Sequence, residues 1–248
     1  MRFTVICITL TASLLAAGTA VAQSPQFRLL KLGNSQVQWV MPSSKDGSMT
    51  LTYSTIDAAE VTPDAFNCQR ITAPDAMLAR SNISYDAWRA EVRAAFDLWQ
   101  SVTRITFVEA PRGASANIKI GAQVDPAGRA FTNVAYDAHA VAEPKPITQS
   151  VICLNPKMPW KIGFDGNLSV YDIRYTIAHE IGHAIGLDHP TSSGVMMGFR
   201  YDEHFRDLQA GDVAGIQALY GAPTVAGNGP EAPISISLTR PSQRPSPE

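Results

Sequence analysis

The sequence has few charged residues and no long basic run, and this scarcity excludes one large class of function. Charged residues make up 17% of the 248 positions, and the formal net charge is −2. A protein that binds nucleic acid usually gathers Lys and Arg into a basic patch. We therefore predict no nucleic-acid partner. No internal repeat occurs either, and a hydrophobic content of 45% is typical of one or two ordinary globular domains.

The only long apolar run lies at the N-terminus, from Phe3 to Ala17, after the single positive residue Arg2. Ala20-Val21-Ala22 then offers a small-x-small cleavage site, so residues 1–22 are predicted to be a signal peptide. A membrane anchor is the alternative, but no stop-transfer pattern follows and polar residues interrupt the run at Thr9, Thr11 and Ser13. We expect a secreted product, periplasmic or extracellular, without a membrane partner after cleavage.

Cysteine is also scarce, with three residues in the whole chain. Cys7 falls in the predicted signal peptide, so the mature protein would keep only Cys68 and Cys153. Two cysteines in an exported chain indicate one disulfide, because export leads to an oxidising compartment. Two buried free thiols are the alternative, since sequence does not place the two Cα atoms relative to each other.

The rest of the chain carries short strand patterns and three helical patterns. Ser84 has the character of an N-cap, and a helix to about Ser101 is predicted to bury its aromatic face. A second helix is predicted over about 170–185. Its apolar stripe repeats every four residues and consists of Ile173, Ile177, Ile181 and Ile185. Strands are expected at 49–54, 104–109, 116–121, 129–136 and 149–155. A long loop or insertion is expected at 56–82, and a last helix at 209–220. This order predicts an α+β fold with an antiparallel or mixed sheet.

The most informative stretch runs from His179 to His189 and reads HEIGHAIGLDH. His179 and His183 lie one helical turn apart on the same face, so both imidazoles can reach one ion. Gly186 can take a positive φ, which lets the chain turn sharply and bring His189 back as a third ligand. Three nitrogen ligands leave one position of a tetrahedral zinc open, as in catalytic rather than structural sites.

Glu180 stands beside the two helical histidines and can reach a water on the metal. We expect zinc to acidify that water and Glu180 to act as general base while the water attacks a peptide carbonyl. At average composition the full pattern should arise by chance in roughly one chain of this length in 10⁵. The plain alternative is a solvated helix end with surface histidines, which this specificity disfavours.

This pattern resembles the metzincin signature, and more of the chain is similar to the matrixin branch of that group. The opening strand of a matrixin domain resembles Leu51-Thr52-Tyr53. Its first helix and second strand resemble residues 94–99 and 102–107, and its closing helix resembles residues 215–221. The resemblance covers about residues 48–222. It implies a metzincin-like zinc protease domain: a twisted, mostly parallel or mixed sheet with an antiparallel edge strand, two long helices and a C-terminal helix. Residues 23–47 would form an N-terminal segment and 223–248 a disordered tail.

The resemblance also implies details around the site. Met197, or Met196 in its place, would be the Met-turn residue beneath the zinc, and Tyr201 would help to wall the primed-side pocket. Pro190 matches serralysins rather than matrixins, and Gly198-Phe199 replaces the usual Tyr-Pro, so substrate preference is not carried over. Only His139 and His204 remain outside the motif, so a second, structural zinc is unsupported. Calcium is possible but unsupported as well, and no cysteine-switch motif is present.

We therefore expect a secreted zinc metalloendopeptidase with metal ligands His179, His183 and His189, the catalytic base Glu180 and no organic cofactor. The expected partners are protein or peptide substrates, and the expected state is a monomer. The resemblance also suggests a link to the extracellular matrix. Residues 129–136 would be the sheet edge that pairs with the substrate. Two alternatives remain: a catalytically silent zinc-containing binding or inhibitory protein on the same fold, and a structural secreted protein without metal.

Overall fold

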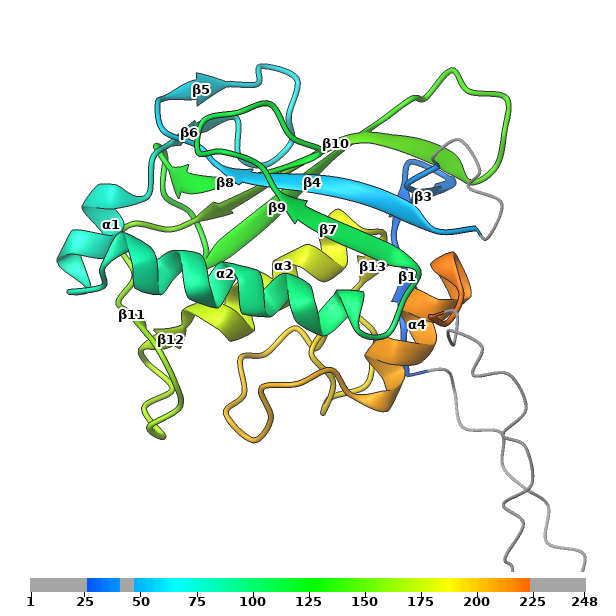
Figure 1. Cartoon of the computed structure of the whole chain (residues 1–248). Helices are drawn as coiled ribbons and strands as arrows, with labels where there is room; N and C mark the ends of the chain where they lie inside the picture. Colours follow the sequence, from blue (N-terminus) through cyan, green and yellow to red (C-terminus); the bar gives the residue numbers. More distant parts are fainter. Residues whose placement is uncertain (1–25, 41–46, 224–248) are drawn as a thin grey trace, which may run out of the picture.

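The computed structural model describes residues 26–40 and 47–223. The predicted signal peptide lies outside the described residues, as does the predicted tail from residue 224 onward. Two long helices, α2 (Tyr85–Gln100) and α3 (Ile173–Ala184), lie side by side on one face of a sheet (Figure 1). A shorter helix, α4 (Ala210–Tyr220), closes the described part of the chain. Within residues 26–40 and 47–223, no helix combines the length and apolar character needed to cross a bilayer.

The main sheet is mixed and mostly parallel, as the resemblance implied, and not the antiparallel sheet that the order of elements left open. Its centre consists of β4 (Met49–Thr55), β7 (Ile105–Glu109), β8 (Ile118–Gln123) and β10 (Lys145–Leu154), which pair in parallel in the order β10-β8-β4-β7. β9 (Ala130–Tyr136) pairs antiparallel with β10, with Thr132 opposite Ile152. Among the described residues β10 is its only strand partner, so the other edge of β9 is free.

The predicted helices follow their sequence patterns closely. The Ser84 side chain accepts a hydrogen bond from the Ala87 N–H and caps α2, whose aromatic face, including Trp88 and Trp99, is fully buried. The three isoleucines of α3 and the C-cap residue Ile185 are fully buried too, in the core between helices and sheet. The left-handed Gly221, with φ +74°, ends α4.

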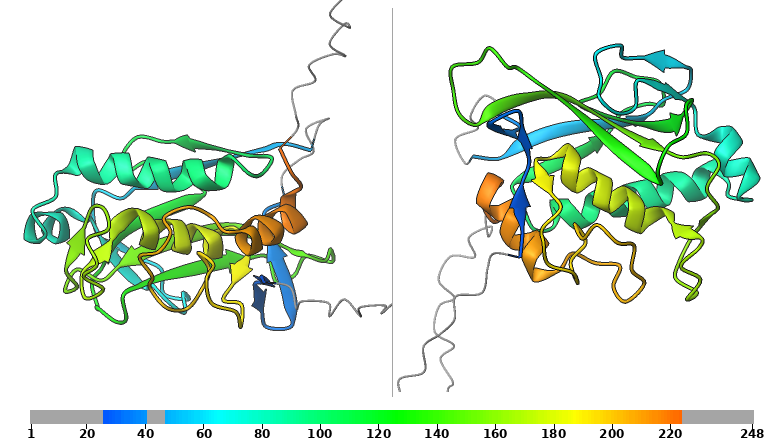
Figure 2. Two further views of the ribbon diagram at one scale, coloured as in Figure 1. Left: turned by 90° about the horizontal axis from the view of Figure 1, so that it is seen from below. Right: turned by 180° about the vertical axis from the view of Figure 1, so that it is seen from behind.

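The predicted loop at 56–82 contains regular structure after all. It holds β5 (Glu60–Val61), β6 (Arg70–Thr72) and the short helix α1 (Asp75–Arg80). β6 pairs with the end of β8, and the part of the insertion before α1 packs on the sheet face opposite the long helices (Figure 2). α1 instead contacts α2 and adds Met77 and Leu78 to the main core. Strand alternation explains the two layers: Ile152 and Leu154 of β10 enter the main core, whereas Val151 and Cys153 enter a small second core with Ile56 and Ile71.

A disulfide joins Cys68 of this insertion to Cys153 of β10, with 5.8 Å between the Cα atoms. The pairing settles the choice between a disulfide and free thiols. β10 itself begins earlier than predicted, at Lys145, because Pro146 lies near the strand start, where a proline is tolerated.

The N-terminal segment packs onto the domain through β1 (Arg28–Leu29), β2 (Lys31–Leu32) and β3 (Ser35–Gln38). β1 pairs with β13 (Leu187–Asp188), and β3 pairs with the first residues of β10. Gly211 and Gly215 of α4 allow this close approach, because a Cβ at either would lie within 3 Å of Gln26 or Phe27. The remaining short strands, β11 (Trp160–Lys161) and β12 (Tyr171–Asp172), pair ahead of α3.

Candidate metal centre

The helix that carries the first two histidines is fixed at both ends. The Asp172 carboxylate accepts a hydrogen bond from the Tyr175 N–H, which caps the start of α3. At the other end Gly186 takes φ +103°, and a Cβ there would lie 2.9 Å from the Val37 carbonyl oxygen. Only glycine fits this turn without strain. The chain then reverses into β13 and presents His189 to the helix.

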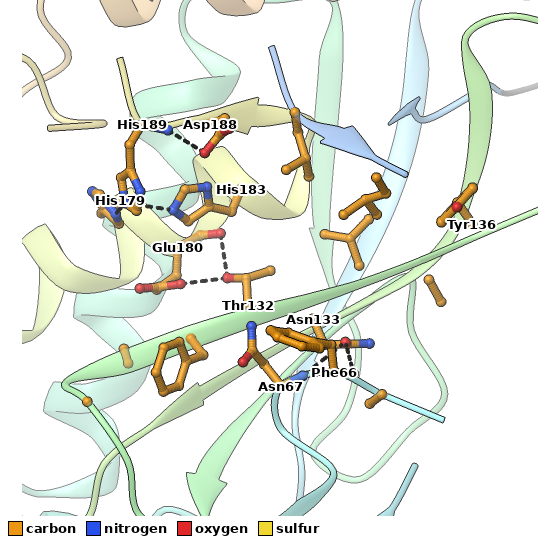
Figure 3. A pocket seen from close by; sticks show the side chains of 18 of the residues that line it. Phe66, Asn67, Thr132, Asn133, Tyr136, His179, Glu180, His183, Asp188 and His189 are labelled. Carbon is orange, nitrogen blue, oxygen red and sulfur yellow. Dashed lines mark hydrogen bonds between the residues drawn. The ribbon is translucent and has the colours of Figure 1, made fainter. Parts of the chain in front are cut away.

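The three histidines converge as the motif predicts. The Nε2 of His189 lies 3.0 Å from the Nε2 of His179 and 3.2 Å from that of His183 (Figure 3). Among the described residues they form the one cluster of three or more potential ligands that could share an ion. His139 and His204 lie apart from it, and His204 pairs with Asp202 instead.

Hydrogen bonds decide which nitrogen of each helical histidine carries the proton. The Nδ1 of His179 lies 2.7 Å from the Met196 carbonyl oxygen, and the Nδ1 of His183 lies 2.8 Å from the Leu187 carbonyl oxygen. A carbonyl can only accept, so both Nδ1 atoms donate and both Nε2 atoms keep a lone pair. These lone pairs point at His189, which can donate to one of them at most. Such a set of converging acceptors fits a cation, and the carbonyl partners are those usual for metal-ligating histidines.

The electrostatics of the triad also suit metal binding. Burial lowers the pKa of His179 well below its ordinary value, and His183 lowers it further. Burial likewise lowers the pKa of His183 and of His189. Neutral imidazole is the ligating form, so at pH 7 no proton has to leave before a metal binds.

Glu180 lies beside the triad, with its side chain almost fully buried. Burial raises the pKa of its carboxyl to about 7, while a hydrogen bond from Thr132 and the positive charge of Arg129 lower it. The Thr132 Oγ1 lies 2.7 Å from the Glu180 Oε2 and 3.0 Å from the Glu180 carbonyl oxygen (Figure 3). The free-edge strand β9 thus holds the candidate base directly.

The turn beneath the triad involves both methionines. The Sδ of Met197 would lie 2.1 Å from a Cβ at Gly182, so the thioether packs against α3 between the two helical histidines. The backbone of Met196 orients His179 instead. The Asp212 carboxylate of α4 accepts hydrogen bonds from the N–H groups of both methionines, at 2.8 and 2.9 Å, and holds the turn in place.

These residues open onto one cleft of about 990 Å³. The triad and Glu180 line it together with β9, and two further segments complete its walls: Leu30 and Leu32 near the N-terminus, and residues 62–67 of the insertion. The Phe66 and Asn67 N–H groups point to the Asn133 side-chain oxygen of β9 (Figure 3). Two exposed aromatic residues border the opening, Phe66 and Phe199, and the Phe199 ring meets that of His189 edge-on.

Tyr201 is not among the residues that line this cleft, but its ring centre lies 5.6 Å from the guanidinium carbon of Arg129, which does line it. The Tyr201 hydroxyl accepts a hydrogen bond from the Asp172 N–H and donates one to Glu203, which turns it toward the start of α3. Sequence reasoning placed Arg129 and Thr132 in the predicted substrate edge without a role of their own, and it missed Asp212. Each lies far from the motif in sequence, and no local pattern marks its contacts with the site.

Comparison with known proteins agrees with the zinc-protease resemblance of the motif. The sequence model of the family described as Matrixin matches residues 75–221. Human matrix metalloproteinase-19 is 45% identical over 60 residues, which cover 23% of this chain and 12% of that protein. Probable matrix metalloproteinase 095L of Invertebrate iridescent virus 3 is 39% identical over 75 residues, covering 29% and 20%. Rat stromelysin-3 is 36% identical over 80 residues, covering 31% and 15%.

The matched stretch therefore spans a fifth or less of each of these relatives, whereas the family match extends over more than half of this chain. That match includes α2, the free-edge strand, the histidine triad and the closing helix. With the triad geometry and the mixed sheet, it shows that the chain belongs to the matrixin family of zinc metalloendopeptidases.

Proposed function

We propose that this chain is a secreted endopeptidase that uses one catalytic zinc to hydrolyse peptide bonds in extended protein segments. The convergence of three imidazole nitrogens beside the Glu180 carboxyl, in an open cleft, carries this proposal. The signal-peptide pattern of residues 1–22 supports secretion. Because two of the similar proteins are named matrix metalloproteinases, proteins of the extracellular matrix are the first substrates to test.

His179, His183 and His189 would hold the zinc. Three neutral nitrogen donors fit its preferred ligands and leave one coordination position open. When bound, zinc would polarise a substrate carbonyl and lower the pKa of a water molecule towards about 7.

Glu180 would accept the proton of the attacking water and later transfer it to the leaving amine. The hydrogen bond from Thr132 keeps its carboxylate in one orientation, so no reorientation is needed before the proton moves. The free edge of β9 offers unpaired backbone groups beside this carboxylate, where an extended peptide can add as a strand.

A comparison of the parent enzyme with Glu180→Gln tests the proposal. We expect both proteins to bind about one zinc per chain, by elemental analysis. Only the parent should cleave denatured casein and a quenched-peptide library, because glutamine keeps the shape of the side chain but cannot take up the proton. We expect Glu180→Gln to lose at least about 10³-fold in kcat.

Two further results complete this test. A chelator such as 1,10-phenanthroline should abolish cleavage by the parent, and added zinc should restore it. A parent that binds zinc but cleaves nothing across the library would instead identify a zinc-containing binding or inhibitory protein on this fold. A chain that binds no zinc would contradict both readings.

A further inference from the structure

Arg129 stands out in the cleft wall because it is half-buried and yet no carboxylate of the described residues contacts it, although its charge acts at longer range on the Glu180 carboxyl. Its Nε is buried without a hydrogen-bond acceptor, and no carboxylate among the described residues forms an ion pair with it. Other half-buried arginines are paired, as Arg174 and Arg206 are with Glu91 at 2.8 Å. A partly desolvated guanidinium without an anion is costly, so a partner from outside the chain would be stabilising.

The position of Arg129 is well defined. Its carbonyl accepts a hydrogen bond from the Asn155 N–H at 2.9 Å, which fixes the backbone just before β9. The guanidinium carbon lies 5.2 Å from the ring centre of Tyr171 and 5.6 Å from that of Tyr201. Two aromatic faces therefore hold the cation in place, and the side chain is ordered before any ligand arrives.

Arg129 also lies within reach of the reacting groups. It lines the same cleft as the triad and Glu180, three residues before Thr132, whose hydroxyl contacts the Glu180 carboxyl. Three residues of a strand span about 10 Å. An arginine and a substrate carboxylate that extend toward each other can close that distance, so the anion would belong to a residue near the scissile bond.

The direction of β9 indicates on which side of the bond this residue lies. Antiparallel pairs are more frequent than parallel ones. A peptide that adds antiparallel to the free edge places its later residues toward the start of β9, where Arg129 lies. Arg129 would then face the first three residues after the cleaved bond.

We propose that Arg129 is a specificity-determining residue that selects substrates with an Asp or Glu side chain within three residues after the scissile bond. The proposal rests on the proposed peptidase function and adds the substrate class. A bidentate contact between guanidinium and carboxylate supplies the recognition.

The experiment uses matched quenched peptides whose cleavage position has been determined by mass spectrometry. Glu or Gln is placed in turn at each of the three positions on either side of that bond. We expect the parent enzyme to favour Glu over Gln by about tenfold in kcat/KM at one or more positions after the bond. The preference should weaken at high salt, because the contact is ionic.

Arg129→Met keeps an unbranched apolar stem against the tyrosines and removes the charge. It should lose the Glu preference while it keeps its zinc content. Loss of the charge also removes one influence that lowers the pKa of Glu180, but this acts on Glu and Gln peptides alike, so the ratio of their kcat/KM values is the readout. Arg70→Met is the matched control, because Arg70 lies outside the cleft and is exposed and paired with Asp125. It should keep the preference despite the same change in net charge.

Equal rates of the parent on Glu and Gln peptides at all positions would overturn the inference, and this comparison needs no variant to fold. A preference that persists in zinc-loaded Arg129→Met would overturn it too, as would a preference found only before the bond. Fluorescence anisotropy with Glu180→Gln measures binding of the same peptides without turnover. If the parent cleaves nothing, the proposed function is refuted. Tighter binding of Glu than of Gln peptides, lost in Arg129→Met, would then still show that Arg129 recognises an acidic side chain, whereas equal binding would refute both.

Discussion

At the scale of single residues, Thr132 links the substrate edge of the sheet to the candidate base. Its hydroxyl has one proton and two acceptors within reach on Glu180, the carboxylate and the backbone carbonyl. The side chain therefore sets both the orientation of the carboxylate and the distance between β9 and α3. Because it acts through Glu180, Thr132 is a positioning residue.

Thr132→Val removes this hydrogen bond and keeps the shape of the side chain. We expect kcat to fall about tenfold, since a hydrogen bond to a charged group contributes about 1.5–3 kcal/mol, while KM and zinc content change little. Steady-state kinetics on a quenched peptide measure both constants. Thr132→Ser is the control and should stay near the parent rate. Equal kcat values for the valine and serine variants would show that the bond has no role in turnover.

At the scale of elements, the part of the insertion between β4 and α1 is built as an addition to the domain, whereas α1 joins the main core. The added part has its own small core and reaches the cleft through residues 62–67. The Cys68–Cys153 disulfide ties it to β10, the strand that pairs with β9. One wall of the cleft therefore depends on a covalent link that forms in an oxidising compartment.

The double variant Cys68→Ser with Cys153→Ser removes this link. The disulfide joins residues 85 positions apart, so its loss raises the conformational entropy of the unfolded chain. We therefore expect the free energy of unfolding to fall by about 2–5 kcal/mol. Urea unfolding followed by tryptophan fluorescence measures the change. The parent treated with dithiothreitol should unfold at the same lower midpoint. An unchanged midpoint in both would mean that the small core alone holds the insertion.

The sequence predicted the parts of this architecture that repeat within a short window. The periodicity of α2 and α3 and the spacing of the triad come from neighbours within one or two helical turns, so one sequence suffices to find them. The insertion escaped prediction because its strands have two and three residues and half of its core comes from β10 and β9. Thr132, Arg129 and Asp212 likewise gain their roles only through contacts across the fold.

At the scale of the whole molecule, the metal-free protein should lose stability as the pH falls below about 6.5. The folded-state pKa of each triad histidine is lowered, so the unfolded chain binds up to three more protons there. The Glu180 carboxyl, with its pKa raised to about 7, binds one more proton in the folded state and offsets one of them. The net difference of about two protons gives up to about 2.7 kcal/mol per pH unit.

Thermal melts of the zinc-free protein across pH 5 to 8 check this expectation. The melting temperature should be nearly constant above pH 7 and fall below pH 6.5. Glu180→Gln removes the offsetting group, so its melting temperature should fall more steeply over the same interval. Identical slopes for the two proteins would show that the Glu180 carboxyl does not titrate between pH 5 and 7.

The N-terminal segment ties the completion of the cleft to the order in which the chain is synthesised. Leu30 and Leu32, made early, form part of the cleft wall, yet their segment docks on β13 and on Gly211 and Gly215 of α4, which are made much later. A nascent chain can therefore contain all three histidines of the triad before this part of the cleft wall has docked. The full groove thus forms only after α4 has been synthesised, and unfinished chains lack the part of the cleft wall that Leu30 and Leu32 provide.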